Sequence, residues 1–375
     1  MPRVADLHND AAPHLVADLD PLSADSWMAQ LGTLNKHRDT AGLLRATRDL
    51  VPSFDYAVTL GPYEAAAATR DLGMMLASLR RHGMEPVEVV PEVEPIMLLW
   101  GRRTDMAPRD TTFHYGSWNP SGDRRRRFTS DPTEDGLIDA VATSIAPLRA
   151  AADALSAAWE LPMASADFVT SCTTTANELL ALSESMAITR KCVDPHFFAS
   201  ELRLYFEPIR MGGRLYSGSS GTQLSTNVID HLLWSSDCTD DVYREFVSET
   251  IRYARPKDRE TYRFTLGQPS LLTRLIRERD RLGPDVSDQA AHGLLRVFNA
   301  LRMFRGRHLA IARAAFQAEI NVCPVGSAGY APDLLTRIFD LTQQARGQLG
   351  EVAAGRGSYK VSTCPFRQAT GKPSR

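Results

Sequence analysis

The chain lacks the cysteine pattern of a disulfide-stabilised protein. Its 375 residues include five cysteines, which are scattered without a CxxC pair and are odd in number. The N-terminus is polar and shows no secretory signal pattern. Disulfide frameworks belong to oxidising compartments and usually use paired cysteines. We therefore expect free thiols and a cytoplasmic protein.

Long hydrophobic runs and an excess of one charge are also missing. No apolar run approaches the roughly 18 residues that a membrane-spanning helix requires. The formal net charge is −2, which argues against a nucleic-acid or anionic-membrane partner. The basic run from Arg124 to Arg127 lies in a loop-like segment and is typical of a solvated surface.

Several well-defined catalytic motifs have no counterpart in the chain. There is no HExxH motif or metal-spaced set of histidines and cysteines, and no Gly-x-Ser-x-Gly nucleophile elbow. The segment that begins at Gly326 lacks the Gly-Lys-Ser/Thr ending of a phosphate loop. Two adjacent pairs, His114-Tyr115 and Asp230-His231, resemble acid–base pairs, although a core or surface role is commoner. The sequence therefore offers no standard hydrolase or nucleotide site.

Helical periodicity dominates what is present. Apolar residues recur at helical spacing along most of the chain, and neither a strand pattern nor an internal repeat is visible. Residues 86–95 are interpreted as an extended connection, and residues 194–226 as a non-helical, Gly/Ser-rich segment. The predicted helices cover residues 24–34, 40–50, 61–81, 96–102, 133–161, 165–191, 228–234, 240–254, 270–279, 287–320 and 334–352.

This pattern predicts an all-α protein whose loops carry the chemistry. We expect an irregular arm over residues 1–20 and one large helical domain over residues 21–354. The polar, basic residues 355–375 are expected to form a disordered tail.

One histidine lies on the apolar stripe of the helix predicted over residues 287–320. Helical spacing puts His308 on the same face as Phe304 and Ile311. An imidazole on a buried face needs partners for its ring nitrogens. A haem iron is one such partner, and a carboxylate or a backbone carbonyl is the commoner one. Spacing alone leaves both interpretations open.

Two other segments are suited to binding an aromatic, anionic ligand. Arg203 follows a pair of phenylalanines, a combination that can hold both an aromatic ring and a carboxylate. A Gly/Ser-rich stretch over residues 217–221 follows this segment, and the glycines around Gly326 and Ser327 let backbone N–H groups approach an anion closely. A surface arginine and plain connecting loops are the alternatives.

Taken in order, these segments resemble the haem-dependent indoleamine/tryptophan 2,3-dioxygenase superfamily, and most of all its monodechloroaminopyrrolnitrin synthases. The likeness extends from about residue 20 to about residue 350. It rests on short stretches that include Trp118-Asn-Pro, Phe206-Glu-Pro-Ile-Arg-Met-Gly-Gly, Arg307-His-Leu and Gly326-Ser-Ala-Gly-Tyr-Ala-Pro. The resemblance implies the all-helical fold of this superfamily, with functional Gly/Ser-rich loops.

The resemblance also implies how a haem would be held. His308 matches the proximal ligand of the iron, and Ser219, Gly326 and Ser327 match loops that contact the cofactor. A related branch attaches its haem through a cysteine four residues after the histidine. Here that position is Ala312, so a non-covalent haem b is expected.

Other positions correspond to the substrate pocket. Phe198 matches a distal phenylalanine, and Arg203 matches an arginine that binds the substrate carboxylate. Gly221, like Ser219 and Ser327, falls in a loop near the substrate, and His114 falls in the distal segment, where its ring is expected to face the pocket. Phe316 stands where the synthases have a tyrosine, so this part of the pocket lacks a hydroxyl.

The function implied is that of a haem b-dependent oxidoreductase of secondary metabolism. Its substrate would be tryptophan or a halotryptophan, which it would rearrange oxidatively and decarboxylate, with molecular oxygen or peroxide as co-substrate. An electron donor and a second copy of the chain are the expected partners. Two alternatives remain at this point: a haem-dependent hydroxylase of a tyrosine-like amino acid, and a non-catalytic haem-binding sensor.

Overall fold

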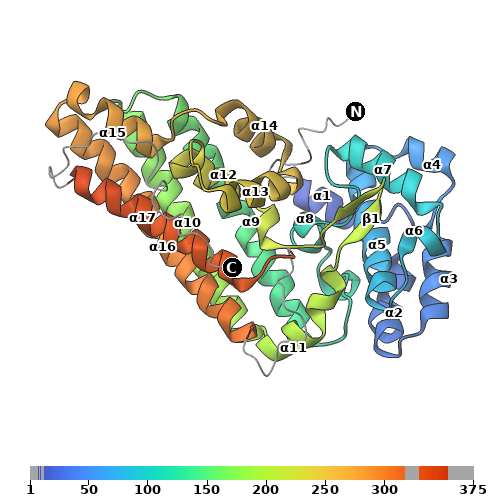
Figure 1. Cartoon of the computed structure of the whole chain (residues 1–375). Coiled ribbons are helices and arrows are strands. Elements are labelled where there is room, and N and C mark those ends of the chain that lie inside the picture. The colour runs from blue at the N-terminus through green and yellow to red at the C-terminus, as the bar shows by residue number, and fades with distance from the viewer. Residues whose placement is uncertain (1–6, 8, 10–11, 317–328, 354–375) are drawn as a thin grey trace, which may run out of the picture. The chain divides into compact units, whose positions relative to one another are not determined.

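The computed structural model describes residues 7, 9, 12–316 and 329–353. These residues form seventeen α-helices, several short 3-10 segments, one π-helical turn and one β-hairpin, which confirms the all-α class (Figure 1). The predicted tail and part of the predicted arm lie outside the described residues, so the proposed domain limits stay a prediction. Among the described residues, no helix is both long and apolar enough to cross a membrane.

Contacts divide the chain into two compact units. The first comprises residues 1–146, 183–224 and 308–334, and the second comprises residues 147–182, 225–307 and 335–375. Four helices contribute residues to both units: α9 (Pro132–Glu160), α10 (Ala166–Cys192), α16 (Pro284–Ala315) and α17 (Pro332–Ala353).

The first unit is organised around α5 (Pro62–Arg81). Every residue of this helix from Ala65 to Leu79 is buried. A helix that is mostly small and apolar all round must be covered on all sides. Helices from different parts of the unit provide that cover (Figure 1): α1 (Ala12–Asp18), α2 (Asp25–Lys36), α3 (Thr40–Leu50), α6 (Pro86–Val89), α7 (Val93–Thr104) and α8 (Thr112–Tyr115).

Two charged residues of α5 are buried in this core and are paired there. Arg70 Nε lies 2.7 Å from Asp71 Oδ1, and Arg126 Nε lies 2.9 Å from the same oxygen. Buried charges are tolerated when they are paired and hydrogen-bonded. Arg126 of the basic run is therefore a core residue, which corrects the expectation that the whole run is a solvated surface.

Two local predictions fail for identifiable reasons. Residues 86–89 and 93–95 are helical rather than extended, because Pro86 and Pro95 occupy the first turns of α6 and α7, where a missing N–H costs nothing. The strand-free expectation is wrong at residues 209–216, where β1 (Ile209–Met211) pairs antiparallel with β2 (Arg214–Tyr216). Gly212 and Gly213 both have positive φ and form the two-residue turn between the strands.

The remaining elements of the first unit are α4 (Phe54–Thr59), α11 (Pro195–Ser200) and the 3-10 segments η2 (Gly122–Arg124), η3 (Leu202–Phe206) and η4 (Gly221–Gln223). Besides its parts of α9, α10 and α16, the second unit contains α12 (Thr226–Asp230), the π-helical turn η5 (His231–Ser235), α13 (Asp241–Thr250), η6 (Ile251–Tyr253), α14 (Pro256–Thr265), α15 (Leu271–Leu282) and the greater part of α17 (Pro332–Ala353).

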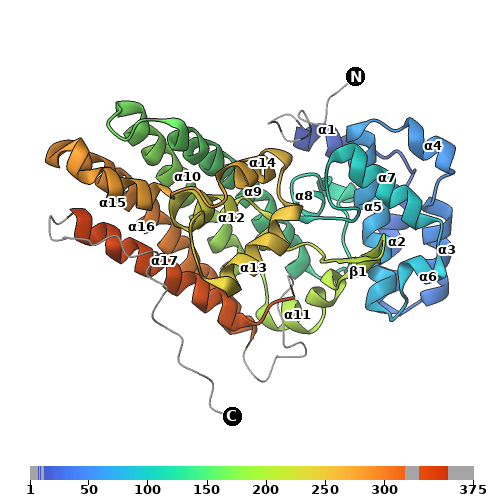
Figure 2. The same ribbon diagram turned by 45° about the horizontal axis from the view of Figure 1, so that its top comes forward.

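Within the second unit, α16 lies beside both α10 and α17, as both views show (Figures 1 and 2). Gly293 of α16 makes its approach to α10 possible. A methyl group at this glycine would lie only 3.3 Å from Cys172 Cβ. The small residue thus lets the two long helices come close at this point.

Candidate functional site

The predicted site residues gather in the first compact unit. They come from all three of its chain segments, although they are spread widely along the sequence. The unit includes His114, Phe198, Arg203, Ser219, Gly221, His308 and Phe316. Gly326 and Ser327 lie outside the described residues.

His308 lies near the C-terminal end of α16 and is half-buried. On its helix face, Leu301 and Ala315 are buried, while Phe304 and Ile311 are half-buried. A half-buried imidazole with an apolar surround can coordinate an iron while its other ring nitrogen forms a hydrogen bond. The alanine at position 312, also half-buried, carries no thiol to bond a haem vinyl group. These features fit a non-covalent haem.

The Gly/Ser-rich loop of residues 217–223 is held in place by one threonine. Thr112 Oγ1 accepts a hydrogen bond from Ser220 N at 2.8 Å and lies 2.6 Å from the Ser220 carbonyl, to which it can donate. Ser219 Oγ donates to the same hydroxyl at 3.2 Å. The main-chain N–H of Thr112 donates to Gln223 Oε1 at 2.8 Å. The loop is therefore hydrogen-bonded to the start of α8 rather than extended into solvent.

The N-terminal end of this loop has further attachments. Arg109 Nη1 donates to the Glu207 and Tyr216 carbonyls, each at 3.0 Å, and Arg109 is itself paired with Asp110 at 2.9 Å. Gly218 N donates to the Phe206 carbonyl at 3.2 Å. A methyl group at Gly218 would lie 2.6 Å from the α-carbon of Phe206, so a side chain is excluded there. Arg109 and Gly218 fix the path by which the chain leaves the hairpin.

His114 is buried and acts as part of a helix cap. Thr111 N–H donates to His114 Nδ1 at 3.0 Å, and the Thr111 hydroxyl lies 2.9 Å from the same nitrogen. Because a main-chain N–H can only donate, Nδ1 must accept, which puts the proton of the neutral ring on Nε2. The ring packs against Trp118 in a T-shaped arrangement, with 4.9 Å between centroids and 90° between planes. His114 is thus held in a single tautomer.

Arg203 and Phe198 come from neighbouring short elements. Arg203 lies on η3 and is only 5% exposed. Phe198 lies on α11, is half-buried, and packs against the core of the first unit. A buried guanidinium keeps its charge and suits a carboxylate in a bidentate geometry. Gly221, by contrast, faces open space, since a methyl group there would meet no atom within 4 Å.

A buried polar cluster in the second unit anchors α16 one turn before His308. Asp230 Oδ1 accepts from Trp234 Nε1 at 3.1 Å, and Asp230 Oδ2 accepts from the Tyr243 hydroxyl at 3.0 Å and from Arg305. Arg305 also donates to the Thr342 hydroxyl. One carboxylate therefore links α12, α13 and α16, and Arg305 extends the link to α17.

His231, the neighbour of Asp230, belongs to a different environment. Its ring centroid lies 4.5 Å from that of Tyr262, and burial lowers the pKa of the imidazole to about 4. The ring is therefore neutral at physiological pH. The two residues face different partners, so their adjacency in the sequence does not form an acid–base pair.

Sequence reasoning missed Arg109, Thr112 and Gln223 because no motif marks them. Their importance comes from bonds to residues about 100 positions away. The one local signal was the Thr-x-x-His spacing at residues 111–114, which resembles a capping box with histidine in place of glutamate.

A family model described as monodechloroaminopyrrolnitrin synthase PrnB matches residues 57–355, which is well over half of the chain. The matched region spans every predicted site residue, from His114 to Ser327. The chain therefore belongs to the monodechloroaminopyrrolnitrin synthase PrnB family.

Proposed function

We propose that this chain is a haem b-dependent oxidoreductase of secondary metabolism that rearranges and decarboxylates tryptophan or a halotryptophan. Membership of a synthase family supports an enzyme rather than a sensor. The observation that carries the proposal is that an imidazole, a buried guanidinium and a hydrogen-bonded Gly/Ser loop all belong to one compact unit.

In this proposal, His308 ligates the haem iron without a covalent link to the macrocycle, and the loops at Ser219 and at Gly326-Ser327 contact the cofactor. When bound, the haem would supply the oxidising chemistry, with molecular oxygen or peroxide as co-substrate and an external electron donor. The protein supplies orientation and excludes water. Arg305 and Asp230 support this role, because they anchor the helix of His308 one turn earlier.

Arg203 would bind the substrate α-carboxylate through paired N–H···O hydrogen bonds, and Phe198 would pack against the indole ring. Thr112 would keep the Ser217–Gln223 loop in place over the bound amino acid. His114, with its proton on Nε2, would donate a hydrogen bond to the substrate. Phe316 would contribute an apolar wall without a hydroxyl.

The iron ligand is tested by the absorption spectrum of the purified protein after haem supplementation. We expect a Soret band that the His308→Ala variant loses and that added imidazole restores, because a free imidazole can occupy the space of the missing ring. A wild-type protein that stays colourless would refute the haem assignment.

The carboxylate clamp is tested by titrating L-tryptophan into the anaerobically reduced protein. Arg203→Gln should weaken the Soret response to tryptophan by about 10- to 100-fold, since a hydrogen bond to a charged group contributes about 1.5–3 kcal/mol. It should leave the response to tryptamine, which has no carboxylate, almost unchanged. Arg210→Gln, on an exposed arginine of β1, is the matched control. Equal losses for both ligands would contradict the clamp.

A further inference from the structure

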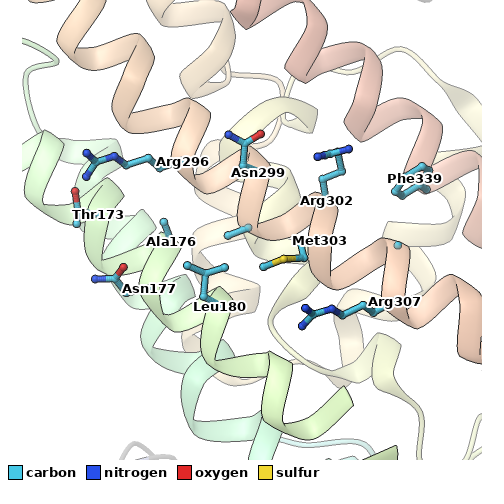
Figure 3. Close-up of a pocket in the computed structure, with 12 residues that line it drawn as sticks. Thr173, Ala176, Asn177, Leu180, Arg296, Asn299, Arg302, Met303, Arg307 and Phe339 are labelled. Carbon is cyan, nitrogen blue, oxygen red and sulfur yellow. The ribbon is translucent and has the colours of Figure 1, made fainter. Parts of the chain in front are cut away.

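The second compact unit contains a groove of about 730 Å³ that no residue of the proposed haem site lines. Residues of α10 and α16 form its two walls, and Phe339 of α17 lies at one side (Figure 3). The two long helices approach closely at Gly293, and further along their course small residues, among them Ala176 and Ala300, line the space between them. The hollow follows from these small side chains.

The floor of the groove is apolar and open to solvent. Leu180 of α10 is 42% exposed and Met303 of α16 is 37% exposed, and the two side chains point toward one another in Figure 3. Single exposed apolar residues are normal, but a pair that shares a hollow is typical of a binding surface. A ligand with an apolar body would bury both side chains together.

The rim is positively charged. Arg296, Arg302 and Arg307 line the groove, and none of its twelve lining residues is acidic. Within the described part of the chain, neither Arg296 nor Arg302 forms an ion pair with a carboxylate. A further guanidinium, that of Arg346, donates to Asn299 Oδ1 at 2.6 Å and adds to the positive potential beside the groove. An anionic group would be attracted to this rim.

From this combination we propose that the groove binds an amphiphilic organic anion, a molecule with one carboxylate or sulfonate on an apolar body. The volume falls within the range of about 300–1,000 Å³ that is usual for small-molecule sites. The chain's own C-terminal residues 354–375 are unsuitable occupants, because they carry five basic residues and no acidic one. The groove is thus a second ligand site, separate from the residues proposed for catalysis.

Calorimetric titration of the full-length protein tests this site with three probes. Decanoate represents an alkyl anion, naphthalene-1-acetate an aromatic anion, and naphthalene-1-acetamide the same aromatic body without charge. We expect at least one anion to bind with one-to-one stoichiometry and the amide to bind at least about tenfold more weakly. The two anions together show whether the floor prefers an alkyl chain or a ring.

Two surface variants locate the binding. Leu180→Glu and Arg302→Glu should each weaken binding of the anion by at least about tenfold. The first places a charge against the ligand's apolar body, and the second replaces an attracting positive charge of the rim by a negative one. Phe264→Glu is the matched control: it introduces the same charge at a 63% exposed apolar residue outside the groove, and should leave binding within about twofold.

Three results would overturn the proposal. They are no binding of either anion at millimolar concentration, equal affinity for the amide, and unchanged affinity in both groove variants. The last result would place the anion elsewhere in the protein, for example at Arg203.

Discussion

The hydroxyl of Thr112 offers the sharpest test of how the Gly/Ser loop is held. Replacing this residue by valine keeps the size and shape of the side chain but removes the oxygen. The main-chain N–H of Ser220 then loses its acceptor, and the Ser220 carbonyl loses its donor. Ser220 is buried, so water does not replace these bonds unless the loop moves.

The expected magnitude follows from these two groups. A buried polar group without a partner costs about 1–3 kcal/mol, so the two together cost about 2–6 kcal/mol if the loop stays in place. If the loop swings out to become hydrated, the loss in free energy of unfolding is smaller. In that case the backbone amides of residues 217–223 lose their protection against hydrogen exchange. Either outcome identifies the hydroxyl as the attachment of the loop.

Urea denaturation and hydrogen exchange together distinguish these outcomes. Thr47→Val is the matched control, because the buried Thr47 hydroxyl donates only to the Leu43 carbonyl of its own helix, at 2.8 Å. It should change stability by less than about 1 kcal/mol. Thr112→Ser should restore most of the stability. If Thr112→Val is as stable as the control and its loop exchanges like wild type, the hydroxyl does not hold the loop.

Three further predictions test other parts of the structure. Gly218→Ala should lower the free energy of unfolding by about 1–3 kcal/mol in urea denaturation, because its methyl group would lie 2.6 Å from the main chain of η3. Gly221→Ala should be neutral, because its methyl group would meet no atom within 4 Å. Equal effects of the two substitutions would contradict this packing. Asp230→Ala should cost about 3–5 kcal/mol, since it leaves a buried arginine without its carboxylate, and a thermal melt close to that of wild type would refute the ion pair. Burial raises the pKa of Glu134 to about 7 from its ordinary 4.5, so the folded state holds this proton more tightly, and stability should fall as the pH rises from about 4.5 to about 7. The pKa of His231 is lowered to about 4 from its ordinary 6.5, so this residue has the opposite effect and makes stability rise with pH. In Glu134→Gln, stability should therefore rise between about pH 4 and pH 6.5. An unchanged pH profile would rule out this pair of effects.

Much of the helical framework was predictable from the sequence because the signals are local. The helix predicted over residues 40–50 has these bounds in the structure, where the Asp39 side chain caps it by accepting from Gly42 N. Asp131 likewise accepts from Thr133 N at the start of α9. Apolar spacing and capping residues act within a few positions of one another, so one sequence suffices to recognise them.

Elements with weak local signals were missed. The helix α14 is short and carries mostly charged and polar side chains, so it shows no apolar stripe over residues 256–265. The hairpin at residues 209–216 has strands of only three residues, too short for alternation to be visible. Its Gly-Gly turn was the available signal.

The sequence by itself determined the all-helical class, the order of the segments that resemble the haem dioxygenases, and the candidates His308 and Arg203. Only the tertiary structure decided that Thr112 and Gln223 hold the Gly/Ser loop, that Arg109 holds the end of the hairpin, and that Asp230 anchors the helix of His308. These bonds join residues that are 75 to 111 positions apart. Hydrogen bonds between such distant partners depend on how helices pack, and residue spacing along one chain carries no record of that packing.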